Sequence, residues 1–268
     1  MKTFATRNIN KSISLLSAVF LSLLLIMGLQ GCSDSDSAPA DQNSKGFYDA
    51  GTANIKLDDD TTDLVLSDLE GMVSGNRFMI MSVSEVLLYD GTFTEITGNT
   101  YTATVNIYKN GVLLPDTATV TGTITTASSM EGTLTGVGAG NGSFSLTYSL
   151  NNEPSALNRI DINWAGTING IKEGEFTTIT STGDVSRSAP FFTNFIILKG
   201  CDYGAGSTVL PISGVNVYEV NMELIDCTDS NVNGTYSGFA TTQSVADSFL
   251  VLAFTNGSHS ASGDLDTD

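Results

Sequence analysis

Apolar and polar side chains alternate with a period of two along most of the chain after residue 45. Successive side chains of a β-strand point to opposite faces, so this alternation predicts strands that each bury one face. The segments that show it most clearly are 101–107, 118–124, 144–148, 160–164 and 218–224. No segment after residue 45 keeps the period of an amphipathic helix with caps at its ends.

Tight-turn dipeptides separate many of these segments. They are Asp90-Gly91, Asn110-Gly111, Asn141-Gly142, Asn169-Gly170, Asn233-Gly234 and Asn256-Gly257. Such pairs favour short hairpin turns, so consecutive strands should be antiparallel neighbours. Because a long open edge invites aggregation, we expect an all-β antiparallel up-and-down meander, closed as a soluble barrel or folded into a two-sheet sandwich. The outward positions are Thr, Ser, Asn and Glu, whereas a transmembrane barrel would present an apolar band there.

The N-terminus has the pattern of an export signal. Basic residues at positions 2, 7 and 11 precede an apolar run from Leu15 to Met27. This run is shorter than the roughly 20 residues that span a bilayer, and its charged start favours a signal peptide. The following Leu29-Gln30-Gly31-Cys32 resembles the bacterial lipobox, in which the cysteine receives a diacylglyceryl group. The resemblance implies that Cys32 is the lipidation site and the first mature residue; the alternative is an ordinary secretory signal with a chance cysteine.

The chain accordingly divides into a lipoprotein signal peptide (1–31), a flexible tether (32–45) and a single all-β domain (46–268). The tether contains small and polar residues with nothing to bury. Ser33 stands where the inner-membrane retention signal of bacterial lipoproteins would place Asp, which favours the outer membrane of a Gram-negative cell. Whether the domain faces the periplasm or the cell surface stays open.

The mature chain is strongly acidic. Of 11 Lys and Arg residues three lie in 1–31, and none of the 29 Asp and Glu residues does, which leaves 8 − 29 = −21. Such a charge repels phosphate backbones, so we expect no nucleic-acid partner. The densest acidic cluster is Asp58, Asp59, Asp60, Asp63 and Asp68. It lacks the ligand spacing of a calcium loop, so no metal and no cofactor is predicted, and solubility is the simpler interpretation of the charge.

The remaining cysteines, Cys201 and Cys227, lie in a chain bound for an oxidising compartment, where thiols pair. We predict a structural disulfide between them. A metal site or a catalytic nucleophile is the alternative, and both lack partners because His259 is the only histidine in the chain.

Several motifs resemble a known group of proteins. They are Gly200-Cys201-Asp202-Tyr203-Gly204, Asn216-Val217-Tyr218-Glu219-Val220, Cys227, Gly234-Thr235-Tyr236-Ser237-Gly238, Ser74-Gly75-Asn76-Arg77-Phe78 and the run 140–148. Together they are similar to uncharacterised β-rich outer-membrane lipoproteins of Gram-negative bacteria. The motifs are turns, strands and a cysteine pair, so the resemblance implies a fold and a location but no activity.

No arrangement of residues indicates catalysis, so we predict that the protein is not an enzyme. Its membrane partner is the bilayer, to which the N-terminal lipid anchor attaches it. The β domain is expected to bind a small apolar or amphiphilic ligand or a protein partner, because closed soluble barrels present a mouth. The alternatives are a surface-exposed structural or adhesive lipoprotein and, less favoured, a hydrolase with paired carboxylates. Trp164 is predicted to be a buried structural residue, on a strand that points Ile160 and Ile162 to the same side.

Overall fold

The computed structural model describes residues 44–56, 63–136, 141–168, 175–187, 201–243 and 247–267. Apart from two short 3-10 helices, η2 (Leu157–Arg159) and η3 (Ser230–Val232), the regular elements of these residues are all β-strands. The predicted all-β class is therefore confirmed. Cys32, the signal peptide and Asp58 to Asp60 lie outside the described residues. Within those residues, no helix is long and apolar enough to cross a membrane.

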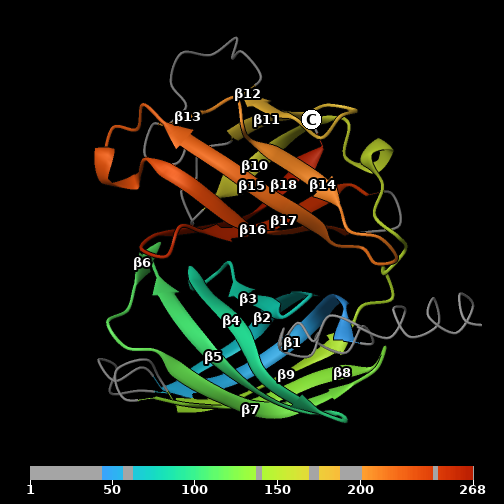
Figure 1. The fold of residues 1–268 in the computed structure, drawn as a ribbon, viewed down its shortest axis with the longest axis vertical. Coiled ribbons are helices and arrows are strands. Elements are labelled where there is room, and N and C mark those ends of the chain that lie inside the picture. The colour runs from blue at the N-terminus through green and yellow to red at the C-terminus, as the bar shows by residue number, and fades with distance from the viewer. Residues whose placement is uncertain are drawn as a thin grey trace, which may run out of the picture. The chain divides into compact units, whose positions relative to one another are not determined.

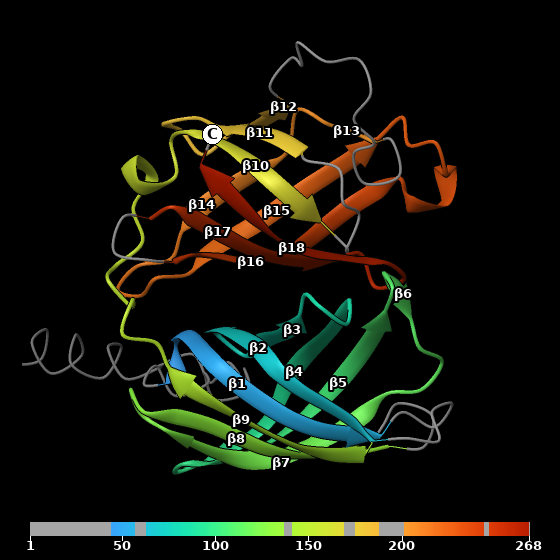
Figure 2. The same cartoon turned by 180° about the vertical axis from the view of Figure 1, so that it is seen from behind.

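Within the described residues, the first sheet has nine strands (Figure 1). They are β1 (Gly46–Lys56), β2 (Leu64–Ser74), β3 (Arg77–Ser82), β4 (Leu87–Thr97), β5 (Thr100–Lys109), β6 (Val112–Leu113), β7 (Ala118–Thr125), β8 (Ser129–Thr135) and β9 (Asn141–Tyr148). Their order is β4-β3-β2-β1-β9-β8-β7-β5-β6, and β4 also pairs with β5, so the sheet closes into a barrel. Every pair is antiparallel, and Figure 2 shows β1 beside β9, the pair that joins the first and last strands.

The second sheet also has nine described strands. They are β10 (Asn163–Ile168), β11 (Glu175–Ile179), β12 (Val185–Arg187), β13 (Asp202–Tyr203), β14 (Thr208–Pro211), β15 (Tyr218–Ile225), β16 (Gly234–Gln243), β17 (Phe249–Thr255) and β18 (Ser260–Thr267). The order is β12-β11-β10-β18-β17-β16-β15-β13, with β14 also on β15. Across the remaining seam, the Val185 amide donates to the Ser207 carbonyl at 2.9 Å and the Val209 amide to the Gly183 carbonyl at 2.8 Å. This barrel is therefore nearly closed.

The up-and-down meander is thus present, but as two successive barrels rather than one. Residues 39–268 still group as one compact unit. In each barrel the first strand pairs with the last, β1 with β9 and β10 with β18. The sequence pattern predicts some hairpin turns correctly, as at Asn110-Gly111, but the turn predicted at Asp90-Gly91 is wrong because both residues lie inside β4. The pattern carries no signal for the closing pairs, because their partners lie far apart in the chain.

Inward side chains fill the first barrel. The rings of Phe78 and Phe93 lie 5.0 Å apart, and those of Phe93 and Tyr101 lie 5.3 Å apart. Gly91 stands opposite Phe78 on the neighbouring strand, where a Cβ would lie 2.0 Å from the Phe78 ring. A glycine is therefore needed at this position to admit the aromatic cluster.

The second barrel buries Trp164 completely, as predicted. Its indole Nε1 donates a hydrogen bond to the Ile160 carbonyl at 3.2 Å. The predicted strand over 160–164 is only partly correct, because β10 begins at Asn163 and Ile160 follows the 3-10 helix η2. Ile162 is 39% exposed and does not share the buried side with Trp164. Cys201 and Cys227 are joined by a disulfide, the pairing that the sequence predicts.

Candidate functional site

A third apolar cluster lies between the two barrels and joins them. It is built from residues of both sheets: Phe47, Met72, Met79, Met81, Leu88, Tyr108, Val215, Val217, Phe239, Val251 and Ala253. Strand β3 is buried on both faces. Phe78 and Ile80 belong to the core of the first barrel, whereas Met79 and Met81 belong to this cluster. Strands buried on both faces have uninterrupted apolar runs. The apolar runs 78–81 and 250–254 are the sequence signal for this junction, and the alternation of apolar and polar residues does not reveal it.

Polar contacts surround this cluster. Arg77 on β3 forms an ion pair with Asp90, with 2.7 Å between Nε and Oδ1, and its Nη1 donates to Ser237 Oγ at 3.0 Å. The guanidinium carbon also lies 5.9 Å from the centre of the Phe239 ring. Arg77 and Asp90 come from the first barrel, and Ser237 and Phe239 come from the second. The Arg77 guanidinium therefore connects the two barrels.

Backbone hydrogen bonds join the barrels as well. The turn after β5 pairs with the turn between β17 and β18, where Val112 stands opposite His259. The Leu113 amide donates to the Ser258 carbonyl at 3.1 Å, and the Ser260 amide donates to the Gly111 carbonyl at 3.0 Å. His259, the only histidine of the chain, thus belongs to the junction, and its buried Nδ1 has no hydrogen-bond partner.

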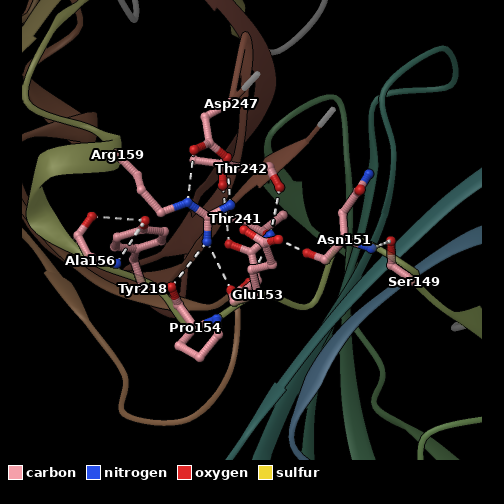
Figure 3. Close-up of polar contacts among 11 residues, drawn as sticks. Ser149, Asn151, Glu153, Pro154, Ala156, Arg159, Tyr218, Thr241, Thr242 and Asp247 are labelled. Carbon is pink, nitrogen blue, oxygen red and sulfur yellow. Dashed lines mark hydrogen bonds and ion pairs between the residues drawn. The ribbon is translucent and has the colours of Figure 1, made fainter. Parts of the chain in front are cut away.

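The connection from β9 to η2 is fixed by side chains (Figure 3). Arg159 holds Asp247 through two contacts, Nη2 to Oδ1 at 2.5 Å and Nε to Oδ2 at 2.8 Å, and these hydrogen bonds lower the pKa of Asp247. Its Nη1 also donates to the carbonyls of Glu153 and Pro154. The buried Asn216 donates to the carbonyls of Asn151 at 2.5 Å and Thr242 at 2.7 Å. The connection is therefore tied to the second barrel at several points.

One carboxyl group is buried at the junction. Glu70 on β2 accepts a hydrogen bond from the Gln243 side chain on β16, and its other oxygen, Oε2, is buried without a partner. Burial and the nearby Asp264 raise the pKa of Glu70 from 4.5 to about 8. The carboxyl groups of Glu70 and Asp264 interact electrostatically, and the Oε2 atom of Glu70 is enclosed. The described geometry therefore makes Glu70 part of the junction.

The interior of the first barrel leaves little free space. A cavity of about 10 Å³ lies among side chains such as Leu69, Phe78 and Val105. A cavity of this size has room for roughly one water molecule. At this position inward side chains occupy the space that a ligand inside the barrel would need.

A much larger hollow lies on the outer wall of the first barrel. It has a volume of about 720 Å³ and crosses β2, β1, β9, β8 and β7. We call it the wall trough. Its lining residues are Thr52, Ala53, Asn54, Val65, Leu66, Ser67, Thr121, Gly122, Thr123, Glu131, Gly132, Thr133, Ser143, Phe144 and Ser145.

Strand register organises the wall trough into rows. One outward row follows the paired residues Val65, Asn54, Ser143, Thr133 and Thr121. A second outward row follows Thr52, Ser145, Glu131 and Thr123. Between them runs a row whose side chains face the interior: Leu66, Ala53, Phe144, Gly132 and Gly122. The two outward rows are the walls of the trough, and the backbone of the middle row is its floor.

A glycine pair explains why the wall is hollowed here. Gly122 and Gly132 stand opposite each other, and a Cβ on either would lie within 2.8 Å of the Tyr101 hydroxyl oxygen. That hydroxyl donates to the Glu131 carbonyl at 3.1 Å, so the strands approach the core closely at this point. The missing side chains therefore allow the floor to lie deep.

Comparisons with known proteins give no family. No family model matches the chain, and no curated protein matches it. Among solved structures, the chain is similar to a Bacteroides fragilis protein that is described as an outer membrane protein. The two sequences are 12% identical, the alignment covers 85% of this chain and 98% of that chain, and the TM-score is 0.28. The chain is also similar to transferrin-binding protein B of Neisseria meningitidis, with 10% sequence identity and a TM-score of 0.24. That alignment covers 78% of this chain and 60% of the other chain. At these TM-scores neither likeness carries an argument about function.

Proposed function

We propose that the protein is a lipid-anchored, non-catalytic protein of the bacterial outer membrane that binds its partner on the outer wall of its β-barrels. The observation that carries this proposal is the contrast between the described interior cavity of the first barrel, about 10 Å³, and a hollow of about 720 Å³ on its outer wall. A binding role in this barrel is therefore a role for its surface.

The chemistry of the described residues supports a binding role. No group of three or more His, Cys, Asp or Glu side chains in the described ranges is placed to hold a metal ion. The cysteines of the second barrel are joined to each other, and His259 lies at the junction rather than beside a nucleophile. Among the described residues that line the wall trough, Glu131 is the one carboxylate.

The proposed anchor is tested by metabolic labelling with a fatty acid. The wild type should be labelled, and Cys32→Ser should not, because its thiol is the acceptor. Cys227→Ser is the matched control and should keep the label. Equal labelling of the wild type and Cys32→Ser would reject the anchor.

The proposed use of the outer wall is tested by mass spectrometry of the mature protein extracted from cells. Native and denaturing spectra should give the same mass, that of the polypeptide with its acyl chains, because the described interior cavity of the first barrel, about 10 Å³, is too small for a retained apolar ligand. A stoichiometric extra mass that is lost on denaturation would instead support binding of a small apolar ligand inside a barrel.

A further inference from the structure

We propose that the wall trough binds a neutral glycan chain that lies across the strands. This inference rests on the proposed use of the outer wall and names the chemical class of the partner.

The spacing of the trough fits a linear polymer of hydroxyl-bearing rings. Adjacent strands lie about 4.8 Å apart, so a row over five strands is about 19 Å long. This strand spacing is close to the length of one sugar ring in an extended chain. The two walls stand two residues apart along each strand, about 7 Å, which leaves room for the width of one such chain.

The side chains of the walls fit the polar groups of a sugar. They are mostly hydroxyls, as on Thr52, Ser145, Ser143 and Thr133, with the amide of Asn54. A hydroxyl both donates and accepts, so it can pair with a sugar hydroxyl in either sense. The exposed Val65 adds an apolar contact for the carbon-bound hydrogens of a ring, since 74% of its surface is accessible.

The charge of the trough disfavours other polymers. Neither Lys nor Arg is among the described residues that line it, and these residues offer no counter-charge to the phosphate, sulfate or carboxylate groups of an anionic chain. Glu131 alone is a weak basis for holding a cationic chain. An extended peptide binds by pairing its backbone with an open strand edge, whereas four of the five strands that the trough crosses, β1, β9, β8 and β7, have a neighbouring strand on both sides. The trough therefore favours a neutral chain that is bound by side chains.

The test titrates the mature, lipidated protein in a detergent without a sugar headgroup. The probes are cellohexaose, laminarihexaose, maltohexaose and chitohexaose, with a galacturonic acid hexamer as the anionic comparison. We expect at least one neutral hexasaccharide to bind with a Kd below about 1 mM, and the anionic hexamer not to bind. No binding by any of the neutral probes, or binding of the anionic hexamer alone, would overturn the proposal.

A matched pair of variants places the binding. Ser143→Trp puts a large side chain into the trough from an exposed outward position and should weaken binding of the neutral probe at least tenfold. Thr104→Trp makes the same change on the exposed face of β5, outside the trough, and should leave binding unchanged. Unaltered thermal unfolding confirms that both variants fold. Equal affinity of Ser143→Trp and wild type would also refute the trough as the site. The proposed use of the outer wall fails on a different result, a ligand that is retained inside a barrel.

Discussion

The two barrels close in different ways. The first closes through continuous strand pairing, with β4 on β5 and β1 on β9. The second leaves a seam beside β13, a strand of two residues in which Asp202 pairs with Ile225 and Tyr203 with Leu224. Cys201 directly precedes β13 and Cys227 follows β15, so the disulfide fastens the end of this short strand. The comparison teaches that the disulfide of the second barrel adjoins a ladder of two residue pairs, beside the seam where this barrel is not fully closed.

The largest effect should come from the core of the second barrel. Trp164→Ala removes a fully buried side chain and its hydrogen bond to the Ile160 carbonyl. We expect the free energy of unfolding to fall by about 3–5 kcal/mol, measured by denaturant unfolding followed by circular dichroism. Phe249→Ala is the control, because 41% of Phe249 is exposed, and it should cost far less. Similar losses for both variants would show that Trp164 is not packed as described.

Reduction of the disulfide should weaken the second barrel alone. The bond spans 26 positions, and the chain-entropy relation gives about 3–4 kcal/mol for a loop of this size. Hydrogen exchange with and without reductant should show faster exchange at the amides of β13 to β15, and unchanged protection in β1 to β9. Faster exchange spread evenly over both barrels would contradict the separate roles of ladder and disulfide.

A smaller effect is expected from the junction. The unfolded chain loses the Glu70 proton near pH 4.5, whereas the folded chain keeps it until about pH 8. The free energy of unfolding therefore falls as pH rises between these values and levels off above them. Glu70→Gln removes this ionisation, so it should match the wild type below pH 4.5 and be more stable above pH 8 by about 1–3 kcal/mol.

Thermal unfolding over a pH series measures this difference. Glu131→Gln changes an exposed carboxyl of β8 and serves as the control. If the advantage of Glu70→Gln does not grow with pH, the carboxyl is not held protonated at the junction.

The strands were the most predictable part of the molecule. The alternation over 101–107, 118–124, 144–148 and 218–224 falls within β5, β7, β9 and β15, because each strand has one face in a barrel and one in solvent. The run 160–164 shows the same period by coincidence, since Ile160 ends a 3-10 turn. The disulfide was predictable because two thiols remain once Cys32 is assigned to the lipid.

The junction and the wall trough were harder to predict for different reasons. Met79 and Met81 belong to an apolar run that signals burial on both faces, but the run does not say what covers the second face. The trough depends on cross-strand register, which brings Asn54, Ser143 and Thr133 side by side from three strands. Single-sequence periodicity fixes which face a residue occupies, and the pairing of distant strands decides its neighbours.

Xenon NMR tests the filled interior most directly. Xenon enters apolar cavities that are empty. With methyl-labelled protein, the resonances of Ile55 and Leu134, which line the small interior cavity of about 10 Å³, should not shift under xenon pressure. Leu134→Ala should enlarge this cavity and produce a shift at Ile55, which shows that the measurement responds. A saturable shift of both resonances in the wild type would reveal an accessible lumen and contradict binding on the outer wall.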